Sequence, residues 1–124
     1  METVATDRSS QAIGPYSQAV VVDGWVYSSG AVGLTASNER IGEGVVEQAE
    51  QTLQNLTAVL EAAGCTLQDV VKATVYLVDM GEFQQVNEVY ARFFGDHRPA
   101  RSCVEVRRLP ADMRVEIDVV ARRP

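Results

Sequence analysis

The stretch Val70-Val71-Lys72-Ala73-Thr74-Val75-Tyr76-Leu77-Val78 decides the fold class. It is rich in β-branched residues and mostly apolar at both its odd and its even positions. This pattern predicts a central strand that is covered on both faces. The elements on either side of it in the chain therefore have to supply neighbouring strands and a covering layer.

An amphipathic helix is predicted on each side of this strand. In the upstream helix, which Gly64 closes, the apolar residues recur every three or four positions: Val46, Ala49, Leu53, Leu56, Leu60 and Ala63. Downstream, Asp79 followed by Glu82 resembles a capping box. The second helix then ends at Gly95, and its buried stripe comprises Phe83, Val86, Tyr90 and Phe93 or Phe94.

The remaining strands come from the two ends of the chain. Two β-prone runs, 20–22 and 25–27, flank Asp23-Gly24, which is the strongest short hairpin signal. The glycine-rich segment 30–44 is expected to be a loop with at most a short strand. Near the C-terminus, Arg101 to Val106 and Arg114 to Ala121 are expected to be strands joined by a turn.

Together these elements predict one α+β domain over residues 1–124, with a single sheet of about six strands and both helices on one face. The chain offers no cover for the opposite face of the sheet. Because the central strand is apolar at both its odd and its even positions, we expect other copies of the chain to bury that face. This predicts a homo-oligomer.

Composition excludes several classes of protein. With 46% hydrophobic and 23% charged residues, the chain is neither disordered nor collagen-like, and no apolar run approaches the roughly 20 residues that cross a bilayer. The start Met1-Glu2-Thr3-Val4 has no basic leader, so we expect a cytoplasmic protein whose two cysteines are thiols.

The net charge of -6 is unevenly distributed along the chain. Residues 1–91 hold three cations against 12 acids, whereas residues 92–124 hold eight arginines against five acids. A nucleic-acid or membrane binder would usually be basic overall, so neither partner is expected, although the arginines could form one local patch.

Signals for metal, nucleotide and nucleophilic chemistry are weak. One histidine and two cysteines 38 positions apart do not make a zinc site, and no phosphate-binding glycine motif occurs. His97 is interpreted as a loop or cap residue, and nothing places a serine beside it. Cys65, which follows a helix-ending glycine, is interpreted as structural.

The two C-terminal strands carry the more informative residues. Alternation places Arg101, Cys103 and Glu105 on one face of the first strand, and Glu116 and Asp118 on one face of the second. If the strands pair in matching register, an arginine, a thiol and carboxylates share one surface. There are two interpretations of that surface. It is an exposed sheet face with cross-strand ion pairs, or it is a binding site in which the arginine binds a carboxylate and a neighbouring glutamate transfers protons or positions water. Cys103 could also be a nucleophile, but a mid-strand cysteine is more often a packing residue.

Several sequence blocks occur in the order seen in the Rid family, also called YjgF/YER057c/UK114. They are Ala12-Ile13-Gly14-Pro15-Tyr16-Ser17-Gln18-Ala19, Ser29-Gly30, Val86-Asn87-Glu88-Val89-Tyr90 with Phe93-Phe94, Pro99-Ala100-Arg101-Ser102-Cys103-Val104-Glu105-Val106 with Leu109-Pro110, and Val115-Glu116-Ile117. The resemblance covers nearly the whole chain and is closest to the RidA-type subgroup.

The resemblance implies a chorismate-mutase-like fold and a homotrimer with sites in the clefts between subunits. It also implies hydrolytic deamination of reactive 2-imino or enamine acids, such as 2-iminopropanoate or 2-iminobutanoate, to 2-keto acids and ammonia. Such an activity protects other enzymes from imines released by dehydratases, and it needs no cofactor. The expected partners are therefore further copies of the chain and small imino or keto acids.

The same resemblance implies roles for individual residues. Arg101 holds the substrate carboxylate, Glu116 positions or activates water, and Tyr16 lines the cleft. Backbone contacts come from Ser29, Gly30 and Cys103, and Asn87 is a weaker cleft candidate. The chain departs from many relatives at Ala31, where they carry glutamine, and in the loop 34–44, so its substrate range is open.

Two other functions fit the same resemblance. A cleft of this kind can bind 2-keto acids without turnover, as a metabolite-sensing or regulatory protein would. Single-stranded RNA cleavage is a recurrent label in the family, but the acidic charge and the single histidine give it little support.

Overall fold

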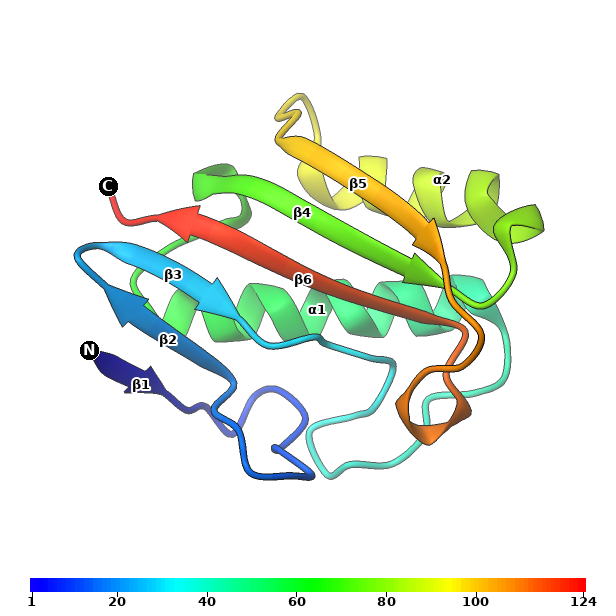
Figure 1. Cartoon of the computed structure of the whole chain (residues 1–124), viewed down its shortest axis with the longest axis horizontal. Helices are drawn as coiled ribbons and strands as arrows, with labels where there is room; N and C mark the ends of the chain where they lie inside the picture. The colour runs from blue at the N-terminus through cyan, green and yellow to red at the C-terminus, as the bar shows by residue number, and fades with distance from the viewer.

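The computed structural model describes all 124 residues as six strands and two α-helices (Figure 1). The strands are β1 (Glu2–Val4), β2 (Ala19–Val22), β3 (Trp25–Ser28), β4 (Val70–Leu77), β5 (Ala100–Glu105) and β6 (Val115–Arg122). The helices are α1 (Val45–Ala62) and α2 (Phe83–Phe94), and the short 3-10 helices are η1 (Leu67–Asp69), η2 (Met80–Glu82) and η3 (Pro110–Asp112).

The strands form one mixed sheet in the order β1-β2-β3-β6-β4-β5. Only β4 and β5 run parallel, and all other neighbours are antiparallel. Both helices lie behind the same face of this sheet (Figure 1), which confirms the expected single-sheet α+β architecture. As predicted, the segment around Val75 is an interior strand, with β6 on one side and β5 on the other.

The hydrophobic core lies between the sheet and the two helices. Alternate residues of β6 face it and are buried: Val115, Ile117, Val119 and Ala121. Leu53, Leu56 and Leu60 of α1 pack in the same core and are almost completely buried. Each such leucine contributes about 1.5–3 kcal/mol relative to an exposed position.

The predicted hairpin is confirmed. Asp23 and Gly24 both have positive φ, 51° and 80°, as the expected two-residue turn requires. The turn fixes the register in which Val22 pairs with Trp25 and Val21 pairs with Val26.

Segment 30–44 forms only the isolated bridges at Ala31 and Leu34, so it is a loop as expected. The strand β1, at the N-terminus, was not expected and completes the sheet. The expected helix cap is wrong, because Asp79 does not cap α2. Its carboxylate accepts a hydrogen bond from the Gly81 amide and caps η2, while Glu82 turns to Arg114. An extra 3-10 turn therefore separates the acidic cap from the helix.

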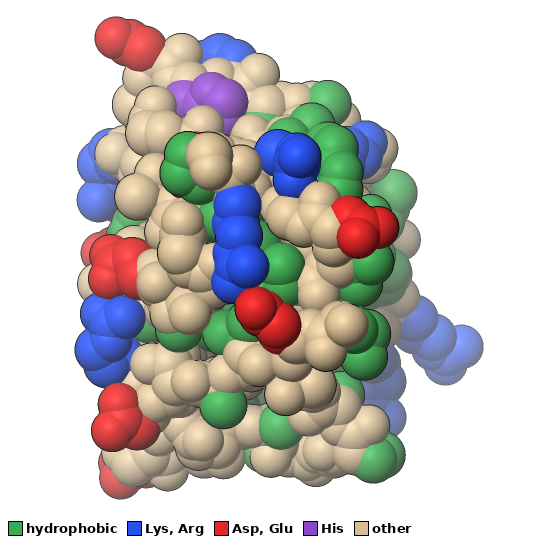
Figure 2. All heavy atoms as spheres, turned by 90° about the vertical axis from the view of Figure 1, so that its left-hand side faces the viewer, with side chains coloured by type: hydrophobic (Ala, Val, Ile, Leu, Met, Phe, Trp, Pro, Cys, Tyr) green, Lys and Arg blue, Asp and Glu red, His purple; other side chains and the backbone are tan.

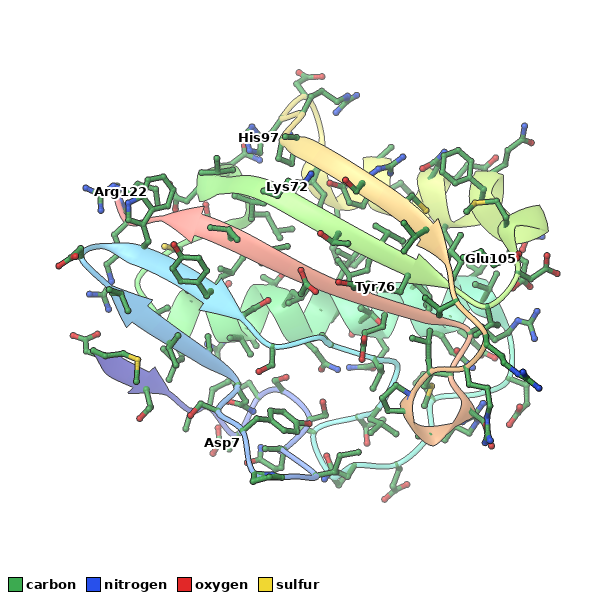
Figure 3. The ribbon with its side chains drawn as sticks, in the orientation of Figure 1. Asp7, Lys72, Tyr76, His97, Glu105 and Arg122 are labelled. Atoms are coloured by element: carbon green, nitrogen blue, oxygen red, sulfur yellow. The ribbon has the colours of Figure 1, made fainter.

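The other face of the sheet is open and carries apolar side chains. Val22, Trp25 and Tyr27 are all more than a third exposed there, as is Val104. Lys72 and Tyr76 project from β4 on this open face, away from the helices (Figure 3). Neither helix combines the length and apolar character that crossing a membrane requires.

Candidate functional site

A cavity of about 260 Å³ opens beside Glu116 of β6. It is lined by Ser10, Gln11, Ile13, Tyr16, Ser29, Gly30, Val32, Leu34, Pro110 and Glu116. These residues come from the loops before β2 and after β3, from η3 and from β6. The structure thus brings together four residues expected in the site, Tyr16, Ser29, Gly30 and Glu116, which lie up to 100 positions apart in the chain.

Glu116 faces the cavity because its strand neighbours Val115 and Ile117 point into the core. A Cβ atom built on Gly30 would lie only 2.6 Å from the Glu116 carboxyl carbon. A glycine at position 30 therefore lets the carboxylate lie against the backbone. Burial raises the pKa of Glu116 above its usual range, and the nearby Asp118 raises that pKa further. A carboxyl group with a raised pKa holds a proton more readily than an ordinary glutamate, which suits it to proton transfer.

The hydroxyl groups beside Glu116 are already engaged with the backbone. The Ser29 hydroxyl donates to the carbonyl oxygen of Ser17 at 2.6 Å. The Tyr16 hydroxyl accepts a hydrogen bond from the Ile13 amide at 3.3 Å. Neither residue has a histidine base beside it, so both are suited to shaping the cavity rather than to nucleophilic attack.

Arg101 belongs to a second cluster, between β5 and α2. Its Nη1 donates to the Asn87 side-chain oxygen at 2.8 Å, and its guanidinium carbon lies 4.9 Å from the ring centroid of Tyr90. No carboxylate pairs with Arg101. The remaining donors of the guanidinium are suited to a bidentate contact with an anion. The buried Tyr90 hydroxyl also has no hydrogen-bond partner.

This cluster lines a second depression of about 290 Å³. Its lining residues are Asn87, Tyr90, Ala91, Arg98, Pro99 and Arg101. Asn87 thus belongs with Arg101, as a side chain that orients the guanidinium. Arg98 also lines the depression, but it donates to the carbonyl oxygens of its own turn, at Gly95 and His97.

Cys103 lies two positions beyond Arg101 on the same side of β5, and its side chain is partly buried. Burial raises the pKa of the Cys103 thiol, and the opposing influence of Arg101 is smaller. The thiol therefore stays protonated at neutral pH, which argues against a nucleophilic role. The other cysteine, Cys65, is a free and buried thiol in the core.

The two clusters lie on opposite faces of the sheet, and here the expected shared surface is wrong. The two C-terminal strands do not pair, because β4 lies between them. Arg101 pairs in register with Ala73, whose side chain is buried on the helix face of the sheet. Glu116 pairs with Tyr76, whose side chain lies on the open face. One chain therefore presents two half-sites, one with Arg101 and one with Glu116.

Glu116 lies beside a second carboxylate of the open face. Asp118 accepts a hydrogen bond from the Tyr76 hydroxyl at 3.0 Å. Burial raises the pKa of Tyr76, and this hydrogen bond raises it further. His97 lines neither half-site; it lies in the turn before β5, with its Nε2 2.7 Å from the Val70 carbonyl oxygen. No group of three or more histidine, cysteine, aspartate or glutamate side chains is arranged to hold a metal ion.

Sequence reasoning missed part of both half-sites. Ile13 and Tyr90 stand within the sequence blocks that carry the family resemblance, so a signal for them was present. Leu34 and Pro110 reach the cavity only through the path of their loops, which no local pattern reveals.

Residues 6–123 match the family model described as Endoribonuclease L-PSP, which includes the YjgF/Rid proteins. The chain belongs to the Rid family. Among curated Rid-family relatives, the mouse 2-iminobutanoate/2-iminopropanoate deaminase is 48% identical over 97% of this chain and 90% of its own length. The Salmonella typhimurium protein of the same name is 43% identical over 98% of both chains.

Solved Rid-family structures match the whole fold. RidA from an Antarctic Psychrobacter superposes with a TM-score of 0.95 at 41% identity, covering 98% of this chain and 99% of its own. Escherichia coli TdcF with bound serine has a TM-score of 0.95 at 38% identity and covers 100% of both chains.

The C-terminal arginines do not form one basic surface. Several are paired with acids: Arg92 with Glu50, Arg108 with Asp112, Arg114 with Glu82, and Arg123 with Glu2. Figure 2, which views the molecule from the left-hand side of Figure 1, shows basic and acidic side chains interspersed on that face. This charge distribution does not resemble the continuous basic track of an RNA-binding protein.

Proposed function

We propose that the protein hydrolyses reactive 2-imino and enamine acids to 2-keto acids and ammonia, as its relatives in mouse and Salmonella are named for doing. The observation that carries this proposal is the pair of half-sites. One offers an arginine without a counter-charge, and the other offers a partly buried glutamate with a raised pKa. Hydrolysis of a 2-imino acid needs one group that binds its carboxylate and one group that activates the attacking water.

A complete site requires a second copy of the chain, and we infer that the protein is a homotrimer. Arg101 and Glu116 lie on opposite faces of the sheet, so they can act on one small molecule only if a neighbouring subunit supplies one of them. The exposed apolar residues Trp25, Tyr27 and Val104 make the open face a suitable contact surface. Three copies related by rotation give three equivalent clefts.

In this cleft Arg101 holds the carboxylate of the substrate and fixes the position of the imine carbon. Glu116, in its ionised form, accepts a proton from water as the water oxygen bonds to that carbon, which gives a carbinolamine. The protonated Glu116 gives its proton to the nitrogen, and its carboxylate then accepts the hydroxyl proton as the C–N bond breaks, the carbonyl forms and ammonia leaves. The sum is imino acid plus water giving keto acid plus ammonia, without a cofactor.

In this mechanism the protein accelerates the reaction mainly by holding the substrate and the attacking water in position. An iminium carbon is already electrophilic, so fixed orientation and one proton acceptor are sufficient. Because Asn87 orients Arg101 and Gly30 lets Glu116 approach, both charged groups are held before the substrate arrives. No covalent intermediate on Cys103 is needed. Two free thiols are typical of reducing compartments, and we place the reaction in the cytoplasm.

The second candidate function is binding of a small amino or keto acid without turnover. The structure of the relative TdcF with bound serine favours it, because the family fold there holds a stable amino acid. A binding protein would show saturable ligand binding and leave the rate of imine decay unchanged.

The test generates imines in solution with an amino acid oxidase and traps the unhydrolysed fraction with semicarbazide. We expect the wild-type protein to lower the trapped fraction, and Arg101→Ala and Glu116→Gln to lose this effect. Ile41→Asn, an exposed isoleucine outside both half-sites, is the matched control. Wild-type protein that binds a 2-keto acid but does not speed imine decay would favour the binding function instead.

A further inference from the structure

The turn η3, which lines the cavity beside Glu116 through Pro110, has an unfavourable backbone conformation. Ala111 and Asp112 both have positive φ, 58° and 52°, and neither is a glycine. In this left-handed region the Cβ atom crowds the backbone, so a residue other than glycine stays there only where its surroundings keep it. Alanine has no polar side-chain atom that could form a compensating hydrogen bond. The contacts around η3 therefore have to keep Ala111 in this conformation.

Arg40 supplies such contacts. Its Nη1 donates to the carbonyl oxygen of Ala111, and its Nη2 donates to that of Asp112 at 3.0 Å. These two hydrogen bonds fix the peptide groups that follow the two strained residues. Arg108 also contacts the turn, but it donates at 2.8 Å to the carboxylate of Asp112, and both side chains of that pair are largely exposed. Arg40 is thus the arginine that binds the backbone of η3.

The guanidinium of Arg40 is oriented independently of η3. Its Nε donates to Glu43 Oε1 at 2.8 Å, and its side chain is only 30% exposed. The backbone of its loop is also fixed, because Arg40 forms an isolated bridge with Leu34. In addition, the buried Gln48 of α1 donates to the Gly42 carbonyl oxygen at 2.8 Å. A guanidinium placed in this way loses little freedom when it donates to two carbonyl oxygens.

Arg40 joins two segments that line the cavity beside Glu116. Gly30 and Leu34 line the cavity from the loop that carries Arg40, and Pro110 lines it from η3. Arg40 itself is not among the lining residues. A movement of η3 would therefore change the space beside Glu116, although Arg40 does not contact a ligand there.

We propose that Arg40 is a positioning residue, which keeps the strained turn η3 in the conformation that bounds the cavity beside Glu116. The inference rests on the proposed function for its effect on catalysis. It concerns the loop 34–44, where the chain departs from many relatives. Without Arg40 the turn relaxes, Pro110 no longer bounds the cavity, and the substrate binds less tightly. Glu116 itself stays in place, because β6 pairs with β3 on one side and β4 on the other.

The first experiment measures KM and kcat for imine hydrolysis by Arg40→Ala and by the double variant Arg40→Ala with Ala111→Gly. We expect Arg40→Ala to raise KM about tenfold and to change kcat by less than about twofold, because substrate binding is weakened and the reacting groups are not displaced. Glycine adopts the left-handed conformation without strain, so the double variant should return to within about threefold of the wild-type KM. A general loss of stability would not be reversed by this second change.

Arg108→Ala is the matched control. It removes an arginine from the same turn but leaves the hydrogen bonds to the backbone of η3 in place. We expect this variant to keep the wild-type KM, because exposed ion pairs contribute little.

A second measurement does not depend on activity. The amides of Asp112 and Met113 donate to carbonyl oxygens within the turn, at 3.1 and 3.2 Å, so their hydrogen exchange reports how often the turn opens. We expect exchange to be at least about tenfold faster in Arg40→Ala, and to return toward the wild-type rate in the double variant.

Three results would overturn the inference while leaving the proposed function intact. They are a wild-type KM in Arg40→Ala, no recovery in the double variant, and an equal rise of KM in Arg108→Ala. Wild-type protein that does not speed imine decay would be a different outcome, because it would refute the proposed function itself. The exchange rates would then still decide whether Arg40 keeps η3 in place.

Discussion

Gly30→Ala should disable the catalytic glutamate without altering its chemistry. The Cβ atom of an alanine would lie 2.6 Å from the Glu116 carboxyl carbon and 2.9 Å from Oε1. An ordinary contact begins near 3.4 Å, so the carboxylate has to move by about 0.8 Å. A displacement of this size at a catalytic group costs on the order of 100-fold in rate, equal to about 2.7 kcal/mol of transition-state stabilisation.

The fold should tolerate this change. Gly30 is exposed and is not among the glycines with positive φ, so alanine fits its backbone. We expect the free energy of unfolding, measured by urea denaturation, to stay within about 1 kcal/mol of the wild type. The matched control is Gly44→Ala, at the start of α1, where the added Cβ lies 3.3 Å from the flexible end of Glu47.

The assay measures kcat/KM for imine hydrolysis, together with the oligomeric mass of each variant. We expect Gly30→Ala to lose activity with unchanged mass and stability, and Gly44→Ala to behave as the wild type. If Gly30→Ala kept more than half of the wild-type kcat/KM, the position of the Glu116 carboxylate would not matter for the reaction.

Four further predictions concern groups in and around the two half-sites. Arg101→Ala should lower kcat/KM by at least about 30-fold. Arg101→Lys should recover only part of this loss, because lysine cannot form the two-point contact with a carboxylate. Wild-type activity in the lysine variant would count against a bidentate contact. Asn55→Ala removes two buried hydrogen bonds and should lower the free energy of unfolding by about 2–4 kcal/mol in urea, whereas the exposed neighbour Gln54→Ala should cost under about 0.5 kcal/mol. Burial and Asp118 raise the pKa of Glu116, so activity should rise with pH through a pKa above the usual glutamate range. Asp118→Asn should move this rise in activity to lower pH. An unchanged pH profile in that variant would exclude Asp118 as a cause of the raised pKa. Because the folded chain keeps the Glu116 proton longer than the unfolded chain, stability should fall as pH rises from the usual glutamate pKa to the folded one, and Glu116→Gln should remove this slope.

Local patterns predicted the elements whose signals lie within a few residues of one another. The Asp23-Gly24 turn, the period of α1 and the termination of α2 at Gly95 all agree with the structure. The strand β1 was not predicted, because the three residues Glu2–Val4 are too few to show an alternating pattern. Its place in the sheet depends on pairing with β2, which lies far from it in the sequence.

The candidate site was predicted as a set of residues but not as an arrangement. Side-chain alternation correctly placed Arg101 with Cys103, and Glu116 with Asp118. Whether those two faces coincide depends on which strand lies between β5 and β6, which is a property of the whole sheet. Since β4 takes that place, the half-sites point in opposite directions. Sequence spacing alone could not reveal this.

The separation of Arg101 from Glu116 makes one measurement decisive. Arg101→Ala and Glu116→Gln, each inactive alone, are mixed in equal amounts, unfolded and refolded together, and assayed for imine hydrolysis. If each cleft takes Arg101 from one subunit and Glu116 from its neighbour, about a quarter of the clefts in random trimers contain both native residues, and about that share of wild-type activity returns. If both residues act within one chain, no cleft is complete and the mixture stays inactive, which would contradict the shared site.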